Sequence, residues 1–269
     1  MNIPLFPFWM CVLVPFILTL FVFSRWKLKL RLALIPAGCA ACTFLSFTFF
    51  FRIPGIVFPL TLAVLSTLAW IGVFILLSFF RDPERFPLEE PGVILSPADG
   101  TVLSISTVYG GEVPCTVKNG QPVELCELLH PGNPIREGTL IAIEMLLTDV
   151  HVNRAPISGR IIHQEYIPGR FYSLRNPESR SQNERVYTVY QDSEIRIGMI
   201  QIASRLVRRI DIFKRTGDTI ERGERVGRIR FGSQVDLLID QKTDVRIRVR
   251  EGDYVRAGET VIAGISAKT

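Results

Sequence analysis

The sequence predicts a mainly β domain, resembling a barrel-sandwich hybrid, that follows an N-terminal transmembrane helical anchor. The first eighty residues are almost free of charge and fall into long apolar runs. From Gly92 onward, short Val, Ile, Leu and Thr runs alternate with Gly, Pro and Asp turns, as expected of strands joined by tight turns. We therefore divide the 269-residue chain into an anchor, residues 1–80, and a β-rich domain, residues 81–269.

The anchor contains three apolar runs, Leu5 to Ser24, Leu32 to Phe51 and Ile56 to Phe80. Each run has the length that a helix of about 20 residues needs to cross a bilayer. Soluble cores seldom supply three such runs in succession, so we expect two to three membrane-spanning helices. Prolines in the first run leave open a re-entrant or interfacial piece there.

The basic loop from Arg25 to Arg31 predicts the orientation of the anchor. Loops rich in Lys and Arg remain in the cytoplasm, so the third run should deliver Arg81 to the cytoplasmic face of the cell's inner membrane. The net charge of +5 suits a surface beside anionic lipid. Nucleic-acid binding would share this charge, but no recognition motif accompanies it, so no nucleic-acid partner is expected.

The cysteines do not predict a metal centre. Cys11, Cys39 and Cys42 lie in the apolar runs, whereas Cys115 and Cys126 have no Cys-x-x-Cys partner. We expect no metal, and we expect a reducing compartment.

An internal repeat supports the β domain. The pattern Gly-Asp-x-[Ile/Val]-x-x-Gly-Glu begins at Gly217 and again at Gly252. It predicts a turn, a short strand and a second turn, with glycines available for positive φ. Such turns occur in lipoyl and biotinyl carriers, so a membrane-tethered carrier modified on Lys242 is an alternative. The only helical piece expected in this domain lies near Glu144 to Leu147.

The pair Gly232-Ser233 suggests that the chain cleaves itself. A serine hydroxyl lies one five-membered ring from the preceding carbonyl, and glycine tolerates the strained backbone that the attack requires. The resulting ester would be expelled by β-elimination, and Ser233 would end as a pyruvoyl group. Gly-Ser pairs are common in turns, but Phe231 and the run from Val235 to Leu238 predict a strand here.

Acid–base candidates are few, because the chain has three histidines. His151 follows an apolar run and precedes a Pro-Ile-Ser-Gly turn, a position that suits a catalytic base at a strand end. His130 lies in a loop and receives little weight. Asp99 lies in an Ala-Asp-Gly turn, where it either bonds its own backbone or orients a histidine.

Six sequence motifs stand in order along the second part of the chain. They are Phe80-Arg81-Asp82-Pro83-Glu84-Arg85, Ser96-Pro97-Ala98-Asp99-Gly100, Asp149-Val150-His151-Val152-Asn153-Arg154-Ala155-Pro156, Tyr166-Ile167-Pro168-Gly169-Arg170-Phe171, Asn183-Glu184-Arg185-Val186 and Phe231-Gly232-Ser233-Gln234-Val235-Asp236. Together they resemble the motifs of the phosphatidylserine decarboxylase family, and the resemblance covers the chain from about Phe80 to about Leu238.

The resemblance implies a lyase made as a proenzyme, which splits at Gly232-Ser233 into residues 1–232 and 233–269 that remain a non-covalent complex. Asp99 and His151 match the positions of the family's catalytic groups. The pyruvoyl group on Ser233 would be the only cofactor, forming a Schiff base with phosphatidylserine and releasing CO2 and phosphatidylethanolamine. The resemblance also implies the membrane as partner and a phospholipid as substrate.

Two departures from the family pattern leave details open. The chain has Phe-Gly-Ser-Gln where longer members have Leu-Gly-Ser-Thr, so it resembles the short form. Arg154 stands where longer members have a second histidine, so His151 either serves both cleavage and decarboxylation or shares the work.

The substrate details also stay open. Arg81, Arg85, Arg154 and Arg170 are candidates for holding the lipid phosphate. An ether-linked substrate, archaetidylserine, is an alternative to phosphatidylserine. The sequence leaves homo-oligomerisation open.

Overall fold

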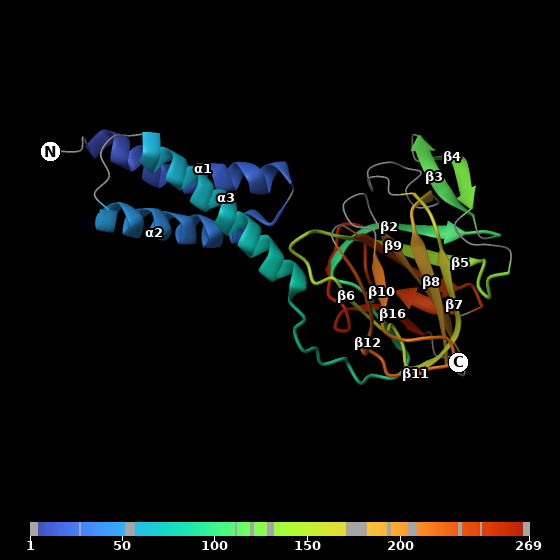
Figure 1. Ribbon diagram of the computed structural model, residues 1–269. Helices are drawn as coiled ribbons and strands as arrows, with labels where there is room; N and C mark the ends of the chain where they lie inside the picture. The colour runs from blue at the N-terminus through green and yellow to red at the C-terminus, as the bar shows by residue number, and fades with distance from the viewer. Residues whose placement is uncertain are drawn as a thin grey trace. The chain divides into compact units, whose positions relative to one another are not determined.

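The computed structural model describes residues 5–26, 28–51, 57–110, 112–118, 121–127, 132–170, 182–192, 195–203, 209–230, 233–242 and 244–265. The chain forms two compact units, Met1–Arg81 and Asp82–Thr269. Helices make up the first unit and strands the second (Figure 1).

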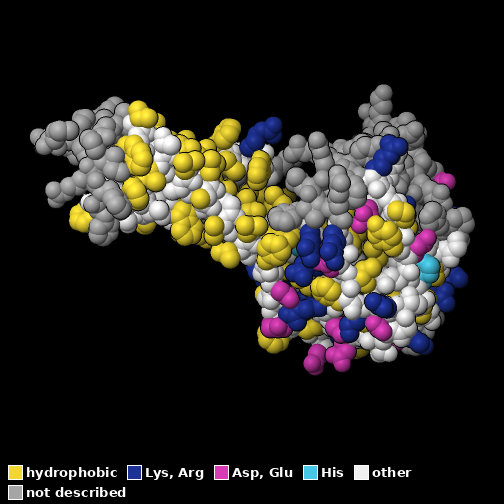
Figure 2. Space-filling view, in the orientation of Figure 1, with side chains coloured by type: hydrophobic (Ala, Val, Ile, Leu, Met, Phe, Trp, Pro, Cys, Tyr) yellow, Lys and Arg dark blue, Asp and Glu magenta, His cyan; other side chains and the backbone are white. Residues whose placement is uncertain are grey.

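The first unit contains the helices α1 (Leu5–Arg25), α2 (Leu34–Phe51) and α3 (Val57–Phe80), with a short 3-10 helix, η1 (Leu30–Leu32). Among the residues that the structure describes, two segments are long and apolar enough to cross a membrane, Leu30–Phe49 and Val57–Phe80. Pro15 lies inside α1. Hydrophobic side chains cover much of the visible surface of this unit, whereas charged side chains are common on the other (Figure 2).

The second unit is built from sixteen strands within the described residues. Their bounds are β1 (Val93–Leu95), β2 (Gly100–Val108), β3 (Glu112–Lys118), β4 (Gln121–Glu127), β5 (Gly138–Met145), β6 (Val152–Arg154), β7 (Gly159–Ile167), β8 (Arg185–Gln191), β9 (Arg196–Ala203), β10 (Ile210–Ile212), β11 (Thr219–Ile220), β12 (Arg225–Ile229), β13 (Ser233–Asp240), β14 (Val245–Ile247), β15 (Tyr254–Val255) and β16 (Val261–Ile265).

An eight-stranded curled sheet organises this unit, with the strand order β11-β7-β8-β9-β13-β5-β2-β15. Every neighbouring pair in it is antiparallel. Smaller sheets, β1-β16-β14, β10-β12-β6 and β3-β4, complete the unit. The predicted fold class, mainly β and preceded by apolar helices, is confirmed.

The strand β13 lies inside the large sheet and separates two cores. Because side chains alternate along a strand, Val235, Leu237 and Ile239 enter the larger hydrophobic cluster, whereas Leu238 enters the smaller one. Because β13 pairs with β5 on one side and with β9 on the other, the run that begins at Ser233 is a strand with two neighbours, as its apolar residues predict.

The repeated motif forms the turns that the sequence predicts. Its four glycines, Gly217, Gly223, Gly252 and Gly258, all have positive φ, between 71° and 100°. The strands between them are β11 and β15. The expected helical piece near Glu144 to Leu147 is wrong, because Glu144 and Met145 end β5 and pair with β13. Tertiary pairing overrides local propensity there.

Candidate active site

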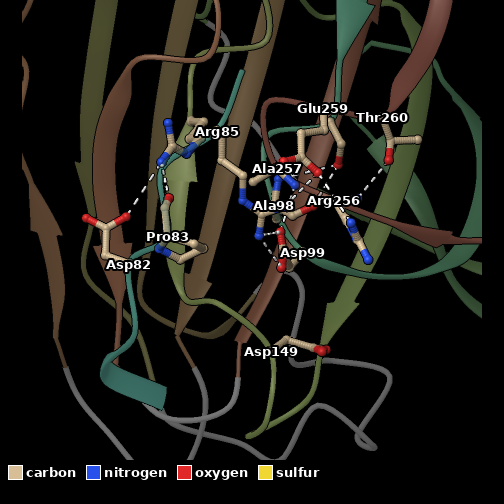
Figure 3. Close-up of polar contacts among 12 residues, drawn as sticks. Asp82, Pro83, Arg85, Ala98, Asp99, Asp149, Arg256, Ala257, Glu259 and Thr260 are labelled. Carbon is tan, nitrogen blue, oxygen red and sulfur yellow. Dashed lines mark hydrogen bonds and ion pairs between the residues drawn. The ribbon is translucent and has the colours of Figure 1, made fainter. Parts of the chain in front are cut away.

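Asp99 lies in a turn that is held by the second copy of the repeat. Ser96 receives a hydrogen bond from Gly258 N and donates its own backbone N–H to the Thr260 carbonyl, both at 2.8 Å. The buried carboxylate of Asp99 accepts a 2.8 Å hydrogen bond from Ala257 N. Figure 3 shows Asp99 beside Ala257, Arg256 and Glu259.

Arg85 pairs with the carboxylate of Asp99. Its Nη2 lies 2.9 Å from Oδ2 and 3.2 Å from Oδ1 of Asp99, and its Nη1 donates to Glu259 at 3.0 Å. Burial raises the pKa of Asp99, while Ala257 N–H and the Arg85 guanidinium act in the opposite direction. The nearby charge of Asp149 raises the pKa further.

His151 is buried in the loop between β5 and β6, and the peptide backbone orients its ring. Its Nδ1 lies 2.9 Å from the carbonyl oxygen of Asp149. A carbonyl can only accept, so in the neutral ring Nδ1 carries the proton and Nε2 holds the lone pair. This tautomer makes Nε2 the basic atom of the site.

The carboxylate of Asp149 in turn holds that loop in place. Its Oδ2 accepts a hydrogen bond from Leu146 N, and its Oδ1 accepts one from the Tyr254 hydroxyl, both at 2.9 Å. Leu146 directly follows β5, and Tyr254 belongs to β15. The position of the His151 ring therefore depends on a local contact with Leu146 and on a contact with Tyr254, which lies 105 residues beyond Asp149 in the sequence.

The sheet register brings Ser233 to the same end of β5 as this loop. Ser233 is paired with Met145, the last residue of β5, and with Ala203, the last residue of β9. On the other side, Ile229 N donates to the His151 carbonyl at 3.2 Å. Gly232, Phe231 and the side chain of Ser233 lie outside the described residues.

The segments that carry Asp99 and His151 are neighbours. Arg154 N, in the strand that follows His151, donates to the Pro97 carbonyl at 2.9 Å. The carboxylate of Asp99 is nevertheless bonded to Arg85 and Ala257, while the Asp149 carbonyl orients His151. A direct role for Asp99 in orienting the histidine stays a prediction.

The predicted phosphate-binding arginines occupy different environments. Arg154 is buried, and its guanidinium donates to the carbonyls of Gly223 and Pro83, each at 2.9 Å. Burial is the main reason that its pKa is lowered. Arg170 and Arg81 are exposed, and the backbone of Arg170 pairs with Asn183.

Sequence reasoning missed the positioning roles of Asp149 and Tyr254. The motif that contains His151 also contains Asp149, but the positioning role of Asp149 depends on the shape of the turn between β5 and β6. Tyr254 occupies the position that Thr219 has in the other copy of the repeat. This difference between a small residue and an aromatic one is the sequence feature that could have indicated a special role for Tyr254. Lys242, the alternative carrier lysine, lies exposed in the turn after β13, and His130 lies outside the described residues.

Residues 74–263 match the sequence model of the phosphatidylserine decarboxylase family. The phosphatidylserine decarboxylase proenzyme of Trichlorobacter lovleyi is 35% identical over 230 residues, 84% of this chain and 94% of the relative. That of Ruegeria pomeroyi is 38% identical over 204 residues, 74% of this chain and 84% of the relative. A Methanothermobacter thermautotrophicus proenzyme, provisionally named for archaetidylserine decarboxylation, is 38% identical over 188 residues, 70% of this chain and 79% of the relative.

Proposed function

Because the chain belongs to the phosphatidylserine decarboxylase family, we propose that it is a proenzyme that cleaves itself and then converts phosphatidylserine to phosphatidylethanolamine and CO2. One structural observation supports this reading most. The hydrogen bond at Nδ1 of His151 places the proton there and leaves the lone pair on Nε2. The loop that carries His151 directly follows β5, whose last residue, Met145, pairs with Ser233. A basic nitrogen and the proposed nucleophile thus belong to one end of the sheet.

Self-cleavage requires a base and a serine after glycine. We propose that the Ser233 hydroxyl, deprotonated by His151, attacks the Gly232 carbonyl, so that the peptide nitrogen leaves and an ester forms. Loss of the Ser233 α-proton then expels the Gly232 carboxylate. The dehydroalanine that remains takes up water and releases ammonia, which leaves a pyruvoyl group at position 233, still joined to Gln234 by its amide bond.

The position of Ser233 suits a fixed pyruvoyl group. It is the first residue of β13, and this strand is paired on both sides, so a new N-terminus at residue 233 would stay anchored. Such a group supplies a carbonyl that condenses with the substrate amine and accepts the electron pair released with CO2. His151, as imidazolium, is our candidate for returning a proton to the substrate carbon.

We further propose that residues 1–80 anchor residues 81–269 at the cytoplasmic face of the inner membrane. The two apolar segments Leu30–Phe49 and Val57–Phe80 support membrane insertion, and the basic loop before α2 supports the orientation. The measurement is protease digestion of inverted and right-side-out vesicles. The β-rich domain should be degraded only where the cytoplasmic face is exposed.

The mass of the C-terminal fragment tests the proposal. The purified wild-type chain should yield residues 233–269 with a keto-blocked N-terminus, and it should release CO2 from phosphatidylserine. Ser233→Ala should give one intact chain without activity, because no hydroxyl is available for attack. An intact wild-type chain that still decarboxylates the lipid would contradict the proposal.

His151→Ala separates the two stages. If His151 serves both, cleavage and turnover should fail together. Normal cleavage with lost turnover would confine His151 to decarboxylation.

A second candidate substrate is archaetidylserine, which the name of the Methanothermobacter relative favours. Both lipids carry the same phosphoserine headgroup, whereas their hydrocarbon chains are joined to glycerol by ester bonds in one and by ether bonds in the other. Turnover of ester-linked and ether-linked substrates, compared at equal mole fraction in detergent micelles, decides between them.

A further inference from the structure

Three arginines surround one aspartate at the small sheet β10-β12-β6, and we call this group the arginine cluster. Asp211 and Arg228 lie in β10 and β12, whereas Arg209 directly precedes β10 and Arg230 directly follows β12. Arg209 Nε lies 2.9 Å from Asp211 Oδ1, and Arg230 donates from Nε and Nη2 to Oδ2, both at 3.0 Å. Arg228 Nε lies 3.9 Å from the same Oδ2. The Arg228 guanidinium also lies 5.9 Å from the centre of the Phe213 ring.

The arginine cluster carries more positive charge than its aspartate neutralises. Three guanidinium groups share one carboxylate, so two positive charges remain in excess. The side chains of Arg209 and Arg230 are 71% and 39% exposed, whereas that of Asp211 is 14% exposed. Like charges held this close repel one another, so the cluster is better suited to binding an anion than to stabilising the fold.

The cluster is attached to the candidate active site through β12. Arg228 is in register with Val152, the residue after His151, and Ile229 N donates to the His151 carbonyl. Arg230 precedes Ser233 by three residues, so their Cα atoms are at most about 11 Å apart. The contacts of β12 with β6 and His151 do not include the Gly232-Ser233 bond, so cleavage does not remove them.

We propose that the arginine cluster binds the phosphodiester of the substrate headgroup. This inference rests on the proposed function and names the residues that recognise its substrate. In a phosphoserine lipid only two carbons and one oxygen separate the amine from the phosphorus. A substrate whose amine is bound to the pyruvoyl group at residue 233 therefore has its phosphate near that residue and near the arginine cluster. Guanidinium groups match phosphate oxygens in charge and in hydrogen-bond geometry. The buried Arg154, by contrast, donates to backbone carbonyls.

The test uses the full chain with Arg230→Gln or Arg209→Gln, and with Arg246→Gln as a control. Arg246 is an exposed arginine on β14, in a different sheet, so the control removes the same charge elsewhere. KM and kcat are measured for phosphatidylserine at varied mole fraction in neutral detergent micelles. Calorimetry measures the Kd for glycerophosphoserine, a soluble headgroup without acyl chains.

The two cluster variants should raise KM and Kd on the order of tenfold, as expected for the loss of one charge-assisted contact, with kcat largely retained. Their thermal midpoints should be unchanged or higher, because charge repulsion is relieved. Arg209→Gln keeps the test valid if Arg230→Gln blocks cleavage.

An unchanged Kd for glycerophosphoserine in both variants would overturn the inference, even if KM rose, because the cluster would then contact only the membrane surface. An equal loss in Arg246→Gln would overturn it as well. If the wild-type chain does not turn over phosphatidylserine, the proposed function fails, while the calorimetric comparison still decides whether the cluster binds the headgroup.

Discussion

Asp99 is a buried carboxylate whose ionised form is stabilised by the backbone N–H of Ala257 and by the guanidinium of Arg85. Burial raises its pKa above the ordinary value of 3.8, and the Ala257 N–H and Arg85 partly counteract this effect. For an acid with a raised pKa, the folded state favours the protonated form, so ionisation costs stability as the pH rises through that pKa. Any step that needs the Asp99 carboxylate should therefore be lost on acidification at a higher pH than for an ordinary aspartate.

Replacing Arg85 tests this dependence. In Arg85→Gln the pKa of Asp99 should rise further, so the acid limb of the cleavage rate against pH should move to higher pH. Freshly translated precursor, followed on denaturing gels, gives the rate. Arg225→Gln is the control, because Arg225 pairs with Asp82 and Glu84 rather than with Asp99. A pH profile identical to that of the wild type would show that Asp99 does not act as a carboxylate in cleavage.

Tyr254 acts on His151 through Asp149, which makes it a positioning residue. In Tyr254→Phe the Asp149 carboxylate loses one hydrogen bond, an interaction worth about 1.5–3 kcal/mol when one partner is charged. Cleavage should slow roughly tenfold or more, while folding is preserved. Tyr109→Phe, at a site that is 66% exposed, is the matched control. Equal cleavage rates in the two variants would refute the positioning role.

The sequence identifies the chemical groups of the site better than their contacts. Asp99, His151 and Ser233 stand in recognisable motifs, so their selection needs no structure. The tautomer of His151 depends on the carbonyl of Asp149, and a backbone carbonyl leaves no mark in the sequence. The partner of Asp149 lies 105 residues away, so only the folded chain brings it into contact.

At the scale of elements, β2 and β5 approach so closely that Gly100 has no room for a side chain. A Cβ on Gly100 would collide with the carbonyl oxygen of Glu144 and lie 2.9 Å from Ile143 Cγ2. Gly100→Ala should therefore reduce the free energy of unfolding by roughly 1–3 kcal/mol or more, as overpacking does. Denaturant unfolding of the uncleaved Ser233→Ala chain gives the value.

The control for this prediction is Gly132→Ala, because Gly132 is exposed and a Cβ there meets nothing within 4 Å. It should leave the unfolding free energy nearly unchanged. If Gly100→Ala behaved like Gly132→Ala, β2 and β5 would be less tightly packed than described.

Short-range patterns predict the elements, whereas their pairing requires the structure. The repeat predicts its turns because glycine at positive φ is a local requirement. The neighbours of β13 are β5 and β9, which precede it by tens of residues along the chain. Apolar alternation marks each of these strands as buried but does not state which ones pair. The misread helix at Glu144 to Leu147 has the same cause.

At the scale of the whole molecule, the segment Asp82–Glu90 has no regular structure but is tied to the β-rich unit by ion pairs. Arg225 bonds Asp82 at 2.7 Å and Glu84 at 2.8 Å, and Arg85 pairs with Asp99. The Arg225 pairs are partly exposed and individually weak, whereas the Arg85–Asp99 pair is buried, and the pairs together fix the segment. The β-rich unit of the structure accordingly begins at Asp82.

The position of β13 inside the large sheet predicts that fragments 1–232 and 233–269 remain bound to each other after cleavage. The fragment 233–269 has 37 residues (269 minus 232) and contributes β13, β14, β15 and β16. Along β13, seven residues pair with β9 and eight with β5. Val235, Leu237, Leu238 and Ile239 are fully or almost fully buried. Losing this strand would open both cores at once, so hydrophobic burial should hold the fragment without a covalent bond.

An affinity tag at the N-terminus provides the measurement. Under native conditions the tag should retain both fragments, and the short one should be released only at the denaturant concentration that unfolds the sheet. High salt should not release it, because apolar burial rather than ion pairing dominates the contact. Val235→Ala and Leu237→Ala should each lower the denaturant concentration at which the fragment is released, whereas Arg246→Gln, at the exposed position of β14, should not. Release of the short fragment in native buffer would mean that β13 is not the central strand of the mature enzyme.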